Sequence, residues 1–134
     1  MALVACRVMA AASSLIVQDA WVRQVPGSPV AAVYLTLHNP TKQTISIVGV
    51  ESSLASHAMI HETRTESGQS RMRPHEQLVV PPGQTVKLEP GGLHVMLLGI
   101  TRPATVGQSV PLLLLLADGT KVEVAAIVRP LTAQ

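Results

Sequence analysis

The 134-residue chain is predicted to be an all-β protein, a β-sandwich or barrel, on three observations. Hydrophobic residues make up 47% of it and are mainly Val, Leu, Ile and Ala, and β-branched side chains favour strands. Ten Pro and nine Gly suit many short strands joined by tight turns. Candidate strands recur about every 8–12 residues, and no stretch has a sustained helical period with caps. With Trp21 and Tyr34 as its only aromatic residues, the protein must have an aliphatic core.

Turn residues divide the chain into its candidate strands. Asp118-Gly119 is a strong signal for a two-residue hairpin. Val33, Leu35 and Leu37 alternate with more polar positions and should share the core face. The run 112–116 is apolar on both faces, which predicts a central strand covered on both sides. The expected strands are residues 15–25, 30–40, 44–50, 57–64, 70–73, 76–80, 85–90, 93–100, 110–117 and 121–129.

Residues 1–14 are interpreted as a leader, and residues 15–130 as a single domain. Arg7, a short apolar stretch and an Ala-x-Ala pattern at 10–12 are features of a signal peptide. The sequence LVAC at 3–6 also resembles a bacterial lipoprotein box, in which Cys6 would be acylated. Such a box follows a longer hydrophobic stretch, so we expect the natural leader to be longer. The alternative is a frayed apolar N-terminus on a cytoplasmic protein.

Composition excludes several classes of function. The net charge is +2 and the basic residues are scattered without interleaved aromatics, which argues against nucleic-acid binding. The longest apolar run of the domain, 110–117, is too short to span a bilayer. A single cysteine permits no internal disulfide and no cysteine-based zinc site. Such a chain suits an oxidising compartment, where a thiol ligand would be at risk of oxidation.

Two histidines and two methionines in residues 61–96 form the candidate metal site. They are His61, Met72, His94 and Met96. On a strand, His94 and Met96 share a face about 7 Å apart, while Val95 points into the core. A hairpin would place Met72 beside His61, and the return through residues 81–83 would bring His94 and Met96 next to them. Neutral imidazoles and thioethers are ligands for soft Cu(I), not for Mg²⁺ or Ca²⁺.

Three further residues near these four are candidate auxiliary ligands. His57 and Met59 lie on the strand of His61 and, by alternation, on its face. They are either extra ligands or an exposed His and a packed Met. His75 follows Met72 closely and is a candidate for a supporting or transfer role.

The four residues resemble the motif of the periplasmic copper chaperone family PCu(A)C. That motif is His, ten residues, Met, twenty-one residues and His-x-Met, and this chain matches it in full at the four positions. The likeness covers about residues 17–129 and includes DAWVR at 19–23 and EPGGLHVMLLGI at 89–100.

The resemblance implies a cupredoxin-like Greek-key fold with the metal at a solvent-accessible edge. It also implies a periplasmic or extracytoplasmic chaperone that carries Cu(I) toward the copper centres of cytochrome c oxidase. The receiver would be an oxidase subunit or a Sco-type thiol protein. Some relatives have a His/Met-rich tail for Cu(II), but this chain ends in RPLTAQ. We expect a monomer, attached to a membrane only if Cys6 is lipidated.

Rival functions remain open at this stage. A metal-free β-sandwich interaction module would need none of the four ligands. An electron-transfer cupredoxin needs a Cys thiolate beside two His, and Cys6 precedes the first strand. A copper enzyme is a third alternative, but we expect no catalysis because no nucleophile–base pair or phosphate loop accompanies the site.

Overall fold

The structure is a computed structural model that describes residues 15–24, 27–102 and 104–130. The leader and Cys6 lie outside the described residues. Within them the chain forms ten strands and no helix, so no helix there is long and apolar enough to cross a membrane. The strands are β1 (Ile16–Gln24), β2 (Val30–His38), β3 (Ile45–Glu51), β4 (His57–Glu66), β5 (Gln69–His75), β6 (Leu78–Val80), β7 (Thr85–Leu88), β8 (Leu93–Leu98), β9 (Ser109–Leu116) and β10 (Lys121–Arg129).

All ten predicted strands are present, with ends that differ by at most two residues. The largest gain is in the β4–β5 hairpin, whose pairing continues to Glu66 and Gln69. Its two turn residues, Ser67 and Gly68, both have positive φ, at 52° and 77°. Positive φ at both central positions is the type I′ geometry that matches the twist of a hairpin, so the strands stay paired up to the turn.

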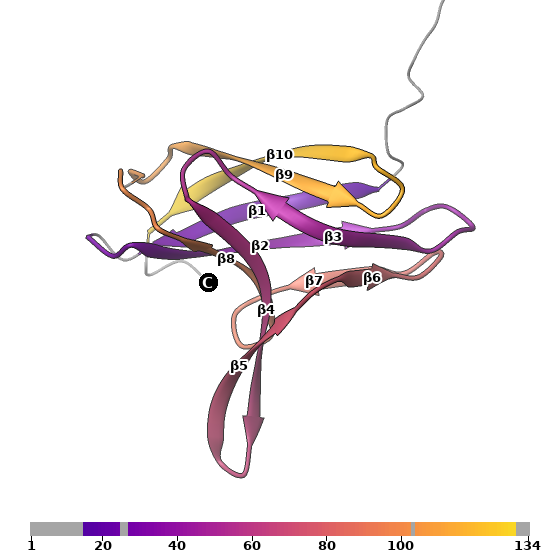
Figure 1. The fold of residues 1–134 in the computed structure, drawn as a ribbon, viewed down its shortest axis with the longest axis horizontal. Helices are drawn as coiled ribbons and strands as arrows, with labels where there is room; N and C mark the ends of the chain where they lie inside the picture. The colour runs from indigo at the N-terminus through magenta and orange to yellow at the C-terminus, as the bar shows by residue number, and fades with distance from the viewer. Residues whose placement is uncertain (1–14, 25–26, 103, 131–134) are drawn as a thin grey trace, which may run out of the picture.

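The strands form one nearly closed, barrel-like sheet. Their order is β5-β4-β8-β2-β1-β10-β9-β3-β6, and β7 pairs with β2 beside this path. Every pair is antiparallel except β1 with β10. Figure 1 shows the β4–β5 hairpin projecting from the body of the barrel as an arm. The all-β prediction is confirmed.

Strand alternation fills the barrel with aliphatic side chains. Val33, Leu35 and Leu37 of β2 are buried together, as their spacing predicts. On β8 the inward positions are Val95 and Leu97. His94 and Met96 therefore point to the outer face of β8.

The prediction for residues 112–116 is correct in position but not in burial. Strand β9 lies inside the sheet between β10 and β3, and Leu112, Leu114 and Leu116 are buried in the core. Leu113 and Leu115 face the other way and are only partly covered, because no second layer packs on the outer face of the described barrel. The strand is thus central in the sheet but covered fully on one side.

Strand β4 changes partners along its length. Residues 57–62 pair with β8, and residues 60–66 pair with β5. Beyond Glu62 the strand leaves β8 and continues only in the projecting arm. His61 therefore lies at the root of the arm, where β5, β4 and β8 run side by side.

A β-bulge in β1 sets the direction of the Trp21 side chain, the larger of the two aromatic side chains. The register between β1 and β2 shifts between Gln18 and Trp21, and Asp19 within the bulge has φ 56°. After the bulge Trp21 lies opposite Tyr34, with ring centroids 4.9 Å apart, and the Arg129 guanidinium lies 5.1 Å over the indole. The bulge thus directs Trp21 to the same outer face as Tyr34.

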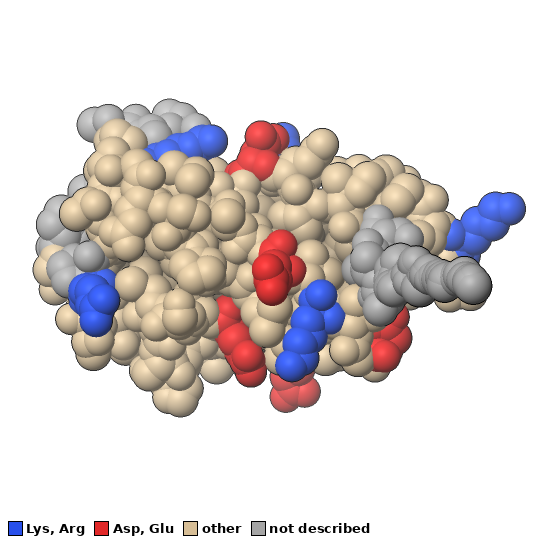
Figure 2. All heavy atoms as spheres, turned by 90° about the horizontal axis from the view of Figure 1, so that it is seen from above, with Lys and Arg blue, Asp and Glu red and all other residues tan. Residues whose placement is uncertain are grey.

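Charged side chains are sparse on the barrel. Figure 2 shows Lys and Arg standing singly on one face, with acidic residues between them, in the part that the structure describes. Among the described residues on this face there is no basic stripe of the kind that binds nucleic acid.

The stability of the barrel should depend on the inward positions of β8. Truncation of the fully buried side chain in Leu97→Ala should lower the free energy of unfolding by about 2–5 kcal/mol, since it leaves a cavity in a close-packed core. Urea titration of the apo-protein measures this change. The exposed control Val106→Ala should stay within about 0.5 kcal/mol of the parent. Equal losses in both variants would contradict the assigned core.

Candidate metal centre

The two candidate imidazoles lie directly opposite each other across one strand pair. His61 of β4 and His94 of β8 are register partners, and their ring centroids are 5.8 Å apart in an edge-on arrangement. One step along the same ladder, Met59 lies opposite Met96. Alternation puts all four side chains on the outer face of the sheet. Two imidazoles and two thioethers are therefore gathered by a single antiparallel ladder.

In each histidine one ring nitrogen makes a hydrogen bond, and the other is buried without a hydrogen-bond partner. Nε2 of His61 lies 3.2 Å from the Sδ of Met59, and Nδ1 of His94 lies 3.4 Å from the carbonyl oxygen of Gly92. Sulfur and carbonyl oxygen only accept here, so these nitrogens carry the protons. The lone pairs then sit on His61 Nδ1 and His94 Nε2, which are buried and have no hydrogen-bond partner. Buried polar atoms are nearly always satisfied, and a metal ion would satisfy both.

His94 is almost completely buried. A metal ligand at a solvent-accessible edge would not need such burial. Only 4% of the residue is exposed, although it points to the outer face. Tyr34 covers it from β2, with ring centroids 6.3 Å apart, and Trp21 packs against Tyr34 in a tilted arrangement. Burial is the main cause that lowers the pKa of His94 below its ordinary value of 6.5, opposed by the hydrogen bond to Gly92 and reinforced by nearby His61. The imidazole is therefore kept neutral, the form that binds metal.

The two motif methionines differ in exposure. Met96 is half-buried beside His94, whereas Met72 is 57% exposed on β5. Met72 lies opposite Thr63, which is two residues beyond His61 on the same face. This makes Met72 a diagonal neighbour of His61, about 7–8 Å away at Cα, within reach of a long side chain. The fold thus brings His61, His94 and Met96 together and holds Met72 on the arm beside them.

The three auxiliary candidates lie in different surroundings. Met59 is 42% exposed, and its sulfur contacts His61. His57 is exposed at the start of β4, opposite Leu98. His75 lies on the other face of the hairpin from Met72, so it does not point toward the ligand cluster.

His75 instead joins the two strands of the arm from behind. Its Nε2 lies 2.8 Å from Oε1 of Glu62, which also accepts from Nε of Arg64 at 3.0 Å. The hydrogen bond from His75 is the main cause that lowers the pKa of Glu62, with Arg64 adding to the effect against partial desolvation. These contacts fasten β5, which carries Met72, to the residue next to His61.

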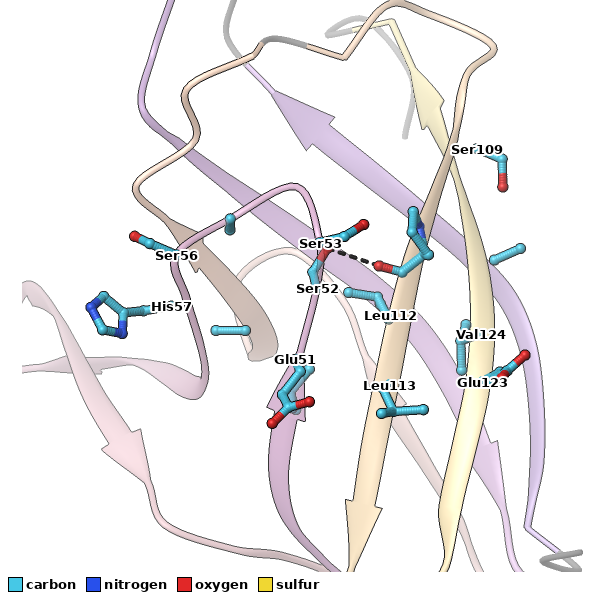
Figure 3. A pocket seen from close by; sticks show the side chains of 15 residues that line it. Glu51, Ser52, Ser53, Ser56, His57, Ser109, Leu112, Leu113, Glu123 and Val124 are labelled. Atoms are coloured by element: carbon cyan, nitrogen blue, oxygen red, sulfur yellow. Dashed lines mark hydrogen bonds between the residues drawn. The ribbon is translucent and has the colours of Figure 1, made fainter.

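Metal sites built only from His, Cys, Asp and Glu side chains are absent from the described residues. The described residues contain no group of three or more such side chains that could hold an ion. A hollow of about 1040 Å³ is an open groove between the β3–β4 connection and β9–β10. Figure 3 shows serines, Glu51 and Glu123 spread along it, with His57 at its border. The groove lacks a convergent set of ligands and lies apart from His61 and His94.

Comparison with known proteins places the chain in a family. The family model described as "Putative lipoprotein LpqE-like" matches residues 15–128. The chain belongs to the LpqE-like family. It is 36% identical over 114 residues to "Putative lipoprotein Lxx21020" of Leifsonia xyli subsp. xyli (strain CTCB07), covering 84% of this chain and 68% of that protein.

Solved structures similar to this LpqE-like chain include copper-binding domains. "CuI-DR1885 from Deinococcus Radiodurans" has 37% sequence identity and a TM-score of 0.68, over 88% of this chain and 80% of that one. The "Copper-bound PCuAC domain from PmoF2" has a TM-score of 0.75 over 88% and 94%, and at 22% identity it supports the fold alone. The cupredoxin-like fold predicted from the sequence is confirmed.

Two supporting features of this LpqE-like domain escaped the sequence analysis. The first is the cover that Tyr34 gives His94, and the second is the link between Glu62 and His75. A signal for the first was present, because Tyr34 is out of phase with the core positions Val33 and Leu35 and must face outward. The second depends on the register between β4 and β5, which spacing alone does not fix.

The lowered pKa of His94 predicts how apo-protein stability varies with pH. The unfolded chain takes up the proton first, so stability should be unaffected well above pH 6.5 and fall as pH drops through about 6.5. Urea unfolding at pH 8 and 5.5 measures the loss. His94→Gln should lose less stability over this interval than the parent. Identical losses would show that burial of His94 does not perturb its titration.

Proposed function

We propose that the protein is an extracytoplasmic copper chaperone that binds one Cu(I) through His61, Met72, His94 and Met96. The observation that carries the proposal is the pair of buried, unpartnered nitrogens on His61 and His94, with methionines on the same outer face. Its relatives of similar fold include structures named as copper-bound or CuI forms. Copper is the cargo of the protein, not a catalyst.

The ligand chemistry favours Cu(I) over other ions. The four side chains are uncharged when His is neutral, so Mg²⁺ and Ca²⁺ would gain little from them. Zinc prefers thiolate or carboxylate in place of thioether. Soft thioethers select Cu(I), and imidazoles accept it.

The exposure of the ligands suits transfer as well as retention. His94 is buried under Tyr34, while Met72 stands exposed on the arm. A partner's ligands can therefore displace the exposed thioether of Met72 first and the buried imidazole of His94 last. This graded exposure allows the ion to be held tightly and still be released stepwise.

The destination and the compartment follow from the family resemblance. A relative and the family model carry the description lipoprotein, which supports an extracytoplasmic, membrane-attached protein. We propose delivery toward the copper centres of cytochrome c oxidase, through an oxidase subunit or a Sco-type protein. Attachment would be through Cys6, which lies outside the described residues.

Anaerobic Cu(I) titration against a chromophoric chelator tests the proposal. The parent should bind one Cu(I), and His94→Gln or Met96→Leu should weaken binding at least about tenfold, or about 1.4 kcal/mol. Affinity should also fall below about pH 6, as histidines take up protons that compete with the ion. His38→Gln, at a residue hydrogen-bonded to Thr85 on the edge of the barrel, is the matched control.

Two outcomes of this titration would reject the proposal. Unchanged affinity in both ligand variants would favour a metal-free interaction module. A strong blue colour in the copper-loaded protein would favour an electron-transfer cupredoxin, although the chain has no Cys after residue 6.

A further inference from the structure

Met59 is a third thioether beside the two histidines and lies outside the four-residue motif. It is the register partner of Met96 on β8, just as His61 is the partner of His94. Side chains opposite each other on an antiparallel pair lie about 4.5–5.5 Å apart at Cβ. The two sulfurs therefore belong to adjacent side chains on one face, next to the imidazole pair.

The side chain of Met59 is directed toward the site. Its Sδ accepts a hydrogen bond from Nε2 of His61 at 3.2 Å, although 42% of the residue is exposed. The sulfur thus contacts one nitrogen of the partly buried His61 imidazole, whose other nitrogen, Nδ1, is buried and has no hydrogen-bond partner.

We propose that Met59 is a transient copper ligand, which with Met96 forms an outer thioether position through which Cu(I) enters and leaves the His61–His94 site, and that it does not hold the ion once the site is filled. This inference rests on the proposed function. Met96 belongs to both positions, so the ion moves by exchanging Met59 for an imidazole without being released. The step is a ligand exchange in which copper stays Cu(I) and no electron is transferred.

The proton balance of the step is simple. In the metal-free protein the Nε2–H of His61 donates to Met59. When the sulfur of Met59 takes the ion, that N–H turns to water, because His61 is only partly buried. Since thioethers do not protonate, the outer position stays available at pH values at which the imidazoles are protonated.

The structure gives Met59 and Met72 different tasks. Met72 is a diagonal neighbour of His61 on the arm, on the side of β4 away from β8, whereas Met59 lies on the β4–β8 ladder itself. A change at Met72 should therefore affect mainly the equilibrium affinity. A change at Met59 should affect mainly the rate of transfer.

Stopped-flow transfer of Cu(I) from the full-length protein to bicinchoninate, without oxygen, tests this division. Met59→Leu keeps a similar apolar volume at an exposed position and should fold normally. Its equilibrium affinity should change by less than about threefold, while the transfer rate falls about tenfold or more. Val79→Leu, at an exposed position on β6, is the matched control and should transfer at the parental rate.

A second readout reports whether the surroundings of the Met59 methyl group change when Cu(I) is added. In the parent, the methyl carbon resonance of Met59 should shift on addition of Cu(I). An unshifted Met59 methyl together with a parental transfer rate in Met59→Leu would overturn the inference and leave the proposed function intact. Failure of the parent itself to bind Cu(I) would instead reject the proposed function.

Discussion

The antiparallel register between β4 and β8 is the constraint on which the candidate site depends. It sets His61 against His94 and Met59 against Met96, on the face opposite the core residues Val95 and Leu97. A slip of one residue would turn the imidazoles into the aliphatic core. The packing of the barrel and the assembly of the ligands are therefore decided by the same pairing.

The residues around this pair of strands give the candidate ligands different solvent exposures, from buried His94 to exposed Met72. The two aromatic residues of the chain, Trp21 and Tyr34, pack with tilted rings in a row that ends on His94. On the other side, the arm carries Met72 away from the barrel, held to β4 by Glu62 and His75. A neutral buried imidazole beside exposed thioethers is the arrangement that the proposed transfer of copper to a partner would require.

Much of this arrangement could be predicted from the sequence. Turn residues and alternation located all ten strands, and the spacing of His94 and Met96 put them on one face with Val95 inward. The burial of His94 could not be predicted, because it depends on Tyr34, sixty residues away in sequence, reaching it across the β2–β8 pair. The contact of Met59 with His61 and the facing of His75 away from the site likewise follow from register and side-chain direction.

X-ray absorption spectroscopy of the Cu(I)-loaded protein tests the central claim most directly. If the two imidazoles and the neighbouring thioethers hold the ion together, the copper edge should show Cu(I) with both nitrogen and sulfur neighbours and the outer-shell scattering of imidazole. A spectrum with only nitrogen and oxygen neighbours, or one without imidazole scattering, would contradict the account.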